Sequence, residues 1–409
     1  MDILIEEIRG SVCVAATQGN RLQGLEIDPI AEEVRWGSIY LAKVKTIDAA
    51  LDAVFLDLDG KNTGILYNSD VRTRSKDGKV TKGGATAIGK RFKAGSMVAV
   101  QAKSAYLPRS DGEYLSGENK IAHMSMDITL PGRYLIYGTM MDGNRISARI
   151  RDKKLRKTLE KMLSDMDNTR GCILRAAAAN TQTEILQREG QILQGAWKDM
   201  QEHLKGKEPK LVALGPDAIQ RSLSDQAGQL IDRIEVVTLE HLNQAEEWCS
   251  IFAPDLVTKI TPIEMEDADQ DLALFYYRDL MGQIEDLFQP YAVLEGGGNI
   301  ITQSMAALTA VDVNKGADKR SLLAVNVEAA EEIARQIRLR NFGGIIVIDF
   351  LKFHGKKEET EVLKALERAV GQDPCTVQIH GKTALGLVEL TRKRRTPPLQ
   401  ERFEGGFGA

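Results

Sequence analysis

Two mostly apolar runs that each end in an aspartate stand out from the hydrophobic pattern of the chain. Residues 307–311 lead into Asp312, and residues 344–348 lead into Asp349. Residues 322–340 lie between the runs and repeat apolar side chains at helical spacing, with charged side chains at the intervening positions. Strand, helix and strand in this order predict a right-handed parallel unit, so both strands end at the same edge of the sheet. We therefore expect the two aspartates to lie close together at that edge, where the functional sites of open α/β sheets collect.

Two carboxylates at such an edge predict a binding site for a hard metal ion. Like charges that lie close together repel each other unless a cation or a shared proton intervenes. With Asn314 as an amide neighbour, the all-oxygen set suits magnesium, or manganese as the alternative, better than zinc. The pattern alone leaves a second interpretation open, in which each aspartate only caps a turn at the end of its strand.

Longer stretches around these residues also form a recognisable pattern. They are residues 296–301, 307–314, 326–340, 343–350 and 385–394, with echoes at 37–40 and 53–57. Together they resemble the catalytic core of the ribonuclease E/G family of single-strand RNA endonucleases. The resemblance implies that Asp312 and Asp349 are catalytic and hold one magnesium ion. It also implies that Asn314 belongs to the catalytic site and orients Asp312.

Composition agrees with such an enzyme. A chain of 409 residues exceeds the size that one core usually supports, so two or more domains are expected. The net charge of −4 argues against nucleic-acid binding by bulk electrostatics and leaves only local basic patches for that purpose. The four cysteines form no CxxC pair and are expected to be reduced thiols. No apolar run is long enough to span a bilayer and no secretory signal pattern is present, so we expect a soluble, cytoplasmic protein without membrane contact.

The pattern and the resemblance together predict a multidomain protein of mixed α+β and α/β class. Short alternating strands with turn-rich breaks predict a small barrel over residues 36–126, and the resemblance implies an OB-fold RNA-binding domain there. The basic, glycine-rich segment 72–93 is expected to be a mobile loop. The other parts that the resemblance implies are a discontinuous ribonuclease-H-like subdomain at 1–35 and 211–261, a 5′-sensor-like region at 127–210, a deoxyribonuclease-I-like catalytic domain at 262–402 and a tail at 403–409.

Binding of single-stranded RNA requires aromatic side chains that stack on bases and cations that follow the backbone. By resemblance, Phe55 is the stacking aromatic and Lys120 is the cation beside it. Ile65 stands where the family has a second aromatic, so stacking in this domain is expected to be weaker. From the pattern alone, Phe55 is more simply a core residue, because aromatics on alternating strands are usually buried.

Gly132 and Arg175 match the positions with which the family recognises a 5′-monophosphate. The threonine that follows the arginine in the family is Ala176 here, and one arginine of the neighbouring motif is Ala148, with Arg149 beside it. Two hydrogen-bond donors for a phosphate are therefore missing. The sequence alone leaves recognition of the 5′ end open. Binding of internal single-stranded segments does not need these donors and would not be affected by either replacement.

Further departures from the family pattern lie near the two aspartates and at the C-terminus. A glutamate of the family is Ala306 here, and the loop after the first aspartate is reduced to residues 315–320. No CxxC follows the catalytic domain, so neither zinc nor a zinc-linked dimer is expected, and the oligomeric state stays open. Candidates for phosphate contacts are Arg338, Arg340, Lys315 and the basic cluster 392–395, with a solvated helix face or a charged tail as the more ordinary explanation.

These observations predict a magnesium-dependent endoribonuclease that hydrolyses single-stranded RNA in RNA processing or decay and leaves 5′-phosphate and 3′-hydroxyl ends. His354 is the only histidine close to the motif in sequence, and we interpret it as a surface or supporting residue. The alternative is a non-catalytic RNA-binding factor on the same fold, which the retained aspartate pair speaks against. A nuclease acting on DNA is a weaker hypothesis, because only contacts to the 2′-hydroxyl would distinguish the two substrates.

Overall fold

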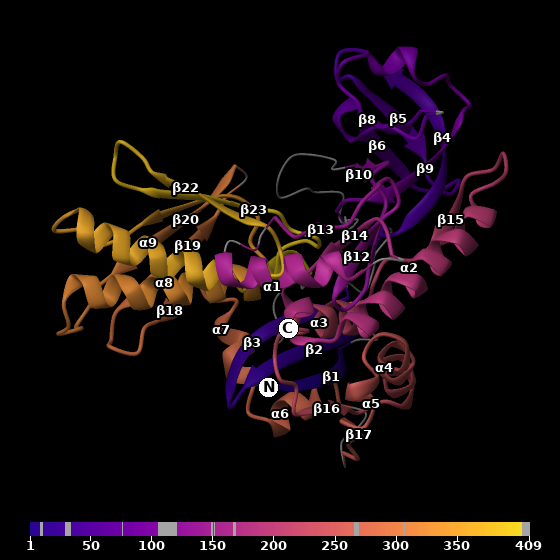
Figure 1. Ribbon diagram of the computed structural model, residues 1–409. Coiled ribbons are helices and arrows are strands. Elements are labelled where there is room, and N and C mark those ends of the chain that lie inside the picture. The colour runs from indigo at the N-terminus through magenta and orange to yellow at the C-terminus, as the bar shows by residue number, and fades with distance from the viewer. Residues whose placement is uncertain are drawn as a thin grey trace. The chain divides into compact units, whose positions relative to one another are not determined.

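The computed structural model of the chain describes residues 1–8, 11–28, 34–75, 77–104, 121–148, 150, 152–166, 169–265, 270–305 and 307–402 (Figure 1). The chain forms two compact units, Met1–Leu25 with Ile263–Ala409 as unit 1 and Glu26–Pro262 as unit 2. Both units contain strands and helices, which confirms the mixed α/β class, while the ribonuclease-H-like and deoxyribonuclease-I-like assignments stay predictions. No helix among these residues is both long and apolar enough to cross a membrane. Several predicted features lie outside the described residues, namely Lys120, Arg149, Ala306 and the tail 403–409.

A six-stranded sheet is the framework of unit 1. Its strands follow the order β18 (Tyr291–Val293), β19 (Asn299–Ser304), β20 (Leu308–Asn314), β21 (Gly344–Asp349), β23 (Val388–Arg392) and β22 (Val377–Lys382). β20 and β21 run parallel and are joined by α8 (Leu322–Leu339), whereas the other neighbours are antiparallel. The predicted strand, helix and strand unit is therefore confirmed.

α8 and α9 (Lys356–Val370) pack against one face of this sheet. Ser321 begins α8 by accepting a hydrogen bond from the amide of Ala324 at 3.2 Å, which satisfies one of the free donors of the first turn. The apolar stripe of the helix and the inward residues of the strands form one buried cluster, which includes Val311, Val313, Val325, Ala329, Ile333, Ile337, Ile346, Ile348, Val388 and Leu390. The residues that alternate with these along the strands lie on the other face, where both aspartates are found.

Two arginines that we expected on a solvated surface are instead buried in unit 1. Arg340 is 1 % exposed and donates hydrogen bonds to Gln336 Oε1 at 2.6 Å and to the carbonyl of Tyr291 at 3.2 Å. Arg392 is 3 % exposed and makes two hydrogen bonds to Asp373, at 2.8 and 3.1 Å. Burial lowers the pKa of Arg340 to about 10, so its charge persists at neutral pH. The expectation was wrong because each guanidinium exchanges water for protein acceptors.

The rest of unit 1 begins with three strands in the order β1 (Asp2–Ile8), β2 (Ser11–Gln18) and β3 (Arg21–Ile27). Short helices accompany them, namely α6 (Ala273–Tyr277), α7 (Met281–Asp286) and α10 (Leu399–Arg402). Glu6 is 2 % exposed and accepts a hydrogen bond from the amide of Leu274 at 2.8 Å. This buried contact ties β1 to α6 across most of the length of the chain.

A closed five-stranded barrel forms in unit 2. Its strands follow the order β4 (Ile39–Asp48), β5 (Ala53–Asp57), β6 (Thr63–Tyr67), β10 (Ala122–Ser125) and β9 (Met97–Ala102), and β9 pairs back with β4. β6 and β10 are parallel, and the other pairs are antiparallel. Val54, Leu56 and Leu66 point inward and are fully buried. The predicted barrel is confirmed and is OB-like, and β15 (Lys210–Ala213) extends its sheet beside β4.

The basic segment 72–93 contains regular structure, contrary to the expectation of a loop. β7 (Arg72–Arg74) and β8 (Val80–Lys82) form an antiparallel hairpin, and a short 3-10 turn, η2 (Ile88–Lys90), follows. Two ion pairs hold the hairpin in place. Arg72 Nε lies 3.2 Å from Asp127 Oδ2, and Arg74 Nη1 lies 2.6 Å from Asp142 Oδ1. Sequence composition shows the cations but not these partners.

The remainder of unit 2 holds a four-stranded sheet with several helices and a parallel strand pair. The sheet has the order β11 (Thr129–Pro131), β12 (Leu135–Gly138), β14 (Cys172–Leu174) and β13 (Arg145–Ile146). The other elements are α1 (Lys153–Ser164), η3 (Ala176–Asn180), α2 (Thr183–His203), α3 (Ala218–Asp225), α4 (Leu239–Phe252), α5 (Pro254–Val257), β16 (Arg233–Val236) and β17 (Ile260–Pro262). All four cysteines of the chain are buried and none forms a disulfide, in agreement with the expectation of reduced thiols.

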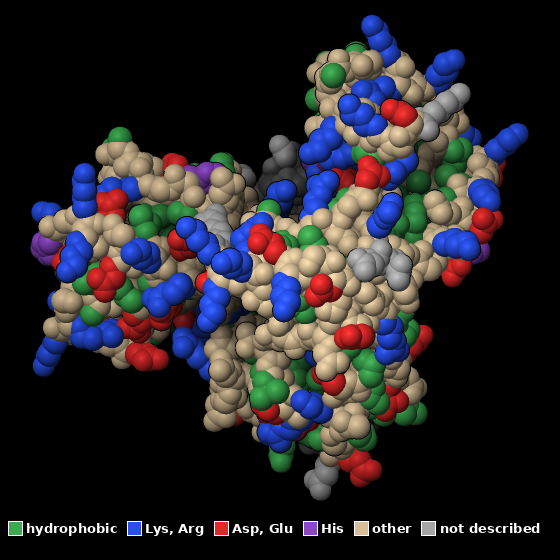
Figure 2. All heavy atoms as spheres, viewed as in Figure 1, with side chains coloured by type: hydrophobic (Ala, Val, Ile, Leu, Met, Phe, Trp, Pro, Cys, Tyr) green, Lys and Arg blue, Asp and Glu red, His purple; other side chains and the backbone are tan. Residues whose placement is uncertain are grey.

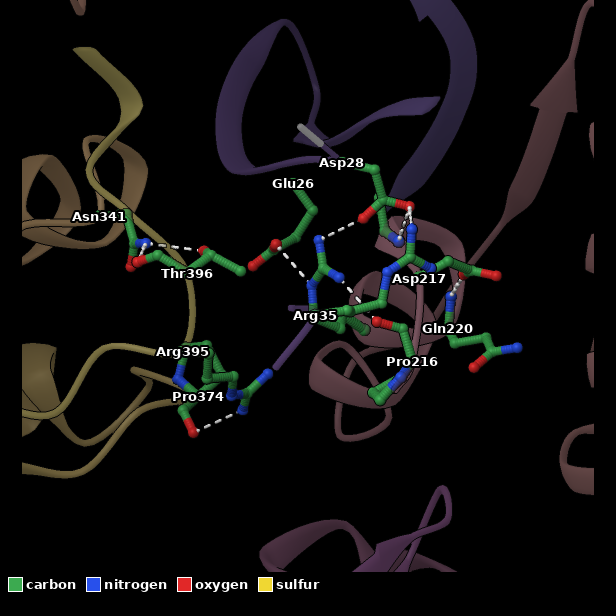
Figure 3. A network of polar contacts seen from close by, with 12 residues as sticks. Glu26, Asp28, Arg35, Pro216, Asp217, Gln220, Asn341, Pro374, Arg395 and Thr396 are labelled. Carbon is green, nitrogen blue, oxygen red and sulfur yellow. Dashed lines mark hydrogen bonds and ion pairs between the residues drawn. The ribbon is translucent and has the colours of Figure 1, made fainter. Parts of the chain in front are cut away.

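A buried arginine on α3 holds this helix to the first residues of unit 2. Figure 3 shows Asp28 from these residues close to Pro216 and Asp217, which lie just before α3. Arg221 is 2 % exposed and donates to Glu26 Oε2 and Asp28 Oδ1, each at 3.0 Å, and to the carbonyl of Pro216 at 2.7 Å. Two carboxylates compensate one buried cation, so the arrangement fixes the position of α3. The last residue of that helix is Asp225, which bears on the 5′-sensor positions.

Candidate active site

Asp312 and Asp349 lie on adjacent central strands of the six-stranded sheet. Buried Val311 and Val313 flank Asp312 on β20, and buried Ile348 precedes Asp349 on β21. Because side chains alternate between the two faces of a strand, both aspartates are turned away from the core, and both are exposed. The β20–β21 register pairs their Cα atoms directly, and adjacent strands are about 4.8 Å apart. The structure therefore brings the two predicted catalytic carboxylates together.

Asn314 lies on the same face as Asp312, two residues further along β20. Its Nδ2 donates a hydrogen bond to Asp312 Oδ2 at 2.8 Å. A hydrogen bond from an amide to a carboxylate limits the rotation of the carboxylate. The geometry therefore matches the orienting role predicted for Asn314 and leaves Asp312 Oδ1 free for a ligand.

This donor set fits a hard divalent cation. Within the described residues, neither Asp312 nor Asp349 forms an ion pair with a basic side chain, so two negative charges face each other with one amide as partner. The same part of the chain holds no group of three or more His, Cys, Asp or Glu residues arranged to bind a metal ion. Two carboxylates without further protein ligands are typical of magnesium, which retains several waters.

Two neighbours on this face were missed by the sequence reasoning. Ile301 on β19 pairs with Asp312 and is 37 % exposed. Glu389 on β23 is exposed and pairs with Val347, so it lies diagonally from Asp349 on the same face. The alternation of residues 388–392 could have indicated that Glu389 points away from the core. The cross-strand register that brings it near Asp349 could not be read from that pattern.

The short loop after Asn314 is held by its own ion pair. Arg320 Nη2 lies 2.6 Å from Asp318 Oδ2 and also contacts Glu328. Hydrogen bonds from Arg320 lower the pKa of Asp318. His354 is exposed, and its backbone amide donates to Glu358 Oε2 at 2.8 Å. The ring of His354 forms no hydrogen bond or ion pair with any described residue, which agrees with a surface position.

Phe55 lies on the outer surface of the barrel. Its neighbours Val54 and Leu56 are fully buried, whereas Phe55 is half-buried and does not belong to the core cluster. The interpretation of Phe55 as an ordinary core residue is therefore wrong. Phe55 pairs with Ile65, the residue that replaces the second aromatic, across β5 and β6. Lys and Arg side chains gather over the barrel in Figure 2. They form a local basic patch, which the negative net charge of the chain had not excluded.

The two predicted sensor residues lie together, but the donors of the arginine are engaged. Arg175 Nη1 donates to the carbonyl of Gly132 at 3.1 Å, and Nη2 lies 3.3 Å from Asp225 Oδ1. Ala176 begins η3 directly after this arginine and adds no side-chain donor. A terminal phosphate at this place would have to compete with Asp225 for the guanidinium.

Glu189 on α2 places a second carboxyl group beside Gly132. Glu189 is 3 % exposed, and its Oε1 accepts hydrogen bonds from the amides of Tyr134 and Leu135, each at 2.9 Å. A Cβ on Gly132 would lie 2.2 Å from this oxygen, so any larger residue there would displace the Glu189 carboxyl group. Burial raises the pKa of Glu189 to about 7. Backbone amides that would otherwise face an anion are thus already occupied by a protein carboxyl group.

The sequence of the chain matches a protein-family profile and several known proteins. The profile of the Ribonuclease E/G family matches residues 129–395. Ribonuclease G from Salmonella typhimurium (strain SL1344) and ribonuclease G from Escherichia coli (strain K12) are each 30% identical to the chain over 404 residues, which is 96% of this chain and 80% of each relative. Ribonuclease E from Haemophilus influenzae is 29% identical over 409 residues, 97% of this chain and 41% of that protein.

Proposed function

The chain belongs to the ribonuclease E/G family, and we propose that it is an endoribonuclease that hydrolyses single-stranded RNA at the site formed by Asp312, Asp349 and Asn314. The observation that carries this proposal is the direct register of two exposed aspartates on parallel strands, one of them held by an asparagine. Within the described residues, neither aspartate makes an ion pair with a basic side chain, so no salt bridge of the fold depends on this pair. Its retention is therefore best explained by chemistry.

Asp312 and Asp349 would hold one magnesium ion, or manganese, which supplies a Lewis acid for the charge that develops on the phosphate and lowers the pKa of an attacking water. Asn314 would hold Asp312 in position through its hydrogen bond to Oδ2, which leaves Oδ1 for the ion. Exposure of both carboxylates lets a phosphodiester approach from solvent. Attack in line with the 3′ oxygen would release a 5′-phosphate and a 3′-hydroxyl.

The substrate class that we propose is single-stranded RNA bound partly on the barrel. Phe55 on the outer surface would stack on one base, in a domain whose surface carries Lys and Arg side chains. Lys120, which lies outside the described residues, would contact the RNA beside Phe55 by analogy with the family. These roles rest on position in the barrel and on the resemblance.

We further propose that cleavage does not require a 5′-monophosphate. Arg175 is engaged by Asp225 and by the carbonyl of Gly132, and the hydroxyl that would assist it is absent at Ala176. The carboxyl group of Glu189 adds a negative neighbour when it is ionised. Internal single-stranded segments need none of these groups.

The test is cleavage of an end-labelled, unstructured, AU-rich RNA by the wild-type protein and by the Asp312→Asn/Asp349→Asn variant, with magnesium or with EDTA. We expect magnesium-dependent cutting that is lost in the double variant and unchanged in the control Asp199→Asn, which alters an exposed aspartate on α2. Rates on 5′-monophosphate and 5′-hydroxyl RNA should agree. RNA that is bound equally by all variants and cut by none would instead establish a non-catalytic RNA-binding protein.

A further inference from the structure

A row of side chains crosses the outer surface of the barrel from β5 to the end of β9. Phe55 on β5 pairs with Ile65 on β6, and Ile65 pairs with His123 on β10. The carbonyl of His123 accepts a hydrogen bond from the amide of Lys103 at 2.8 Å, which places Lys103 next in the row. Direct neighbours in such a row are about 4.8 Å apart, so Phe55 and His123 are separated by roughly 10 Å.

Tyr67 adds a second ring beside His123. It lies two residues after Ile65 on β6 and therefore on the same outer face. The ring centroids of Tyr67 and His123 are 4.8 Å apart, and the planes meet at 77°, an edge-to-face contact. Such contacts are favourable and hold both rings in fixed orientations. Both rings are half-buried, whereas Ile65 between them and Phe55 is only 6 % exposed.

The electrostatic surroundings suit a neutral stacking surface with a cation at its edge. Burial lowers the pKa of His123, the charge of Lys103 lowers it further, and Asp70 acts in the opposite direction. The imidazole is therefore neutral at neutral pH. Lys103 Nζ lies 2.7 Å from Asp70 and its side chain is 46% exposed, so it is fixed beside the row while remaining open to solvent.

We propose that Tyr67 and His123 form a second base-stacking position on the barrel, which replaces the aromatic ring that Ile65 lacks. The ligand is a nucleobase of single-stranded RNA, so the inference rests on the proposed function for the nature of the ligand. One base lies on Phe55 and another on the Tyr67–His123 pair. Lys103, directly after β9, lies close to the RNA backbone. Stacking of this kind accepts any base, because every base has a π-face.

The experiment measures the affinity of the full chain for a fluorescently labelled, unstructured 12-nucleotide RNA by anisotropy, in EDTA so that metal-dependent cleavage does not interfere. Tyr67→Leu/His123→Leu keeps apolar side chains at both positions and removes both rings. We expect its dissociation constant to rise about tenfold or more. The matched control Tyr67→Phe keeps the ring and should stay within about twofold of the wild type. Thermal unfolding of each variant is recorded alongside.

A dissociation constant that is unchanged in the double variant overturns the proposal, as does an equal loss in Tyr67→Phe, which would assign the effect to the hydroxyl. Adding Ile65→Phe to the double variant supplies a new ring in the same row and is expected to recover most of the lost affinity; no recovery also counts against stacking. Phe55→Leu separates this inference from the proposed function. If Phe55→Leu weakens binding and the double variant does not, only the second position fails. If the wild type binds no RNA, the proposed function fails first.

Discussion

Replacement of Asn314 by alanine tests the link between one hydrogen bond and the chemistry of the site. The amide of Asn314 is the only side-chain donor that the described residues offer to Asp312, at 2.8 Å from its Oδ2. Alanine removes this donor and leaves the backbone pairing of β20 with Asn299 on β19 intact. The expected loss is therefore confined to the orientation of one carboxylate.

The magnitude follows from the kind of hydrogen bond and from its exposure. A hydrogen bond to a charged group contributes about 1.5–3 kcal/mol. Asp312 is exposed and Asn314 is half-buried, so solvent screens the interaction and the lower end applies. A loss of about 1.4 kcal/mol from transition-state stabilisation corresponds to a rate that is about tenfold lower. The magnesium concentration for half-maximal rate should rise as well, because a freely rotating carboxylate binds the ion less well.

The assay is single-turnover cleavage of end-labelled RNA across a magnesium titration, with thermal unfolding recorded in parallel. Gln303→Ala is the matched control, since it removes an exposed amide from the same face of the neighbouring strand. A positioning role requires a slower rate and a higher magnesium concentration for half-maximal rate in Asn314→Ala, at an unchanged unfolding temperature. Wild-type kinetics in Asn314→Ala, or the same loss in Gln303→Ala, would refute the reasoning.

Further predictions concern stability and RNA binding. Phe55→Ala should weaken RNA binding by about 1–3 kcal/mol in an anisotropy titration, because it removes one stacking surface; an unchanged affinity would contradict its position as a platform. Arg392→Leu should lower the free energy of unfolding in urea by about 3–5 kcal/mol, because it leaves Asp373 buried and unpaired, while the exposed Lys393→Met should change little. Burial raises the pKa of Glu189 from 4.5 to about 7, so its stabilising proton is fully bound below pH 4.5 and is lost as the pH rises through 7. Glu189→Gln should flatten that fall in unfolding free energy, and a parallel fall in both proteins would disprove the assignment.

The sequence was sufficient where the signal is local. The runs that end in Asp312 and Asp349 each encode a strand and its exposed position, and the helical spacing between them encodes the crossover. Parallel strands joined in this way end at one edge, so the meeting of the two side chains followed from chain order. The barrel followed in the same manner from short alternating strands with turns between them.

Sequence reasoning failed where a residue depends on a distant partner. Arg340 and Arg392 each lie in a basic stretch that looks solvated. Their hydrogen-bond acceptors, however, come from segments up to 54 residues away in the chain. Phe55 looked like a core residue because its pattern cannot tell which face of a strand is inside the barrel. β15 joins β4 across about 170 residues, and no local pattern identifies such a pair. In each case the sequence pattern did not show which distant segments would lie side by side.

The alternation of buried and exposed side chains along β20 and β21 also determines how core substitutions would reduce the activity of this enzyme. A slip of either strand by one residue would carry its aspartate into the interior under α8 and would expose a valine or an isoleucine instead. A carboxyl group without partners in that interior is unfavourable whether it is ionised or protonated, so the slipped register is strongly disfavoured. Molecules that fold therefore carry a correctly formed site, and core substitutions should reduce the fraction of active molecules while each remaining molecule turns over at its normal rate.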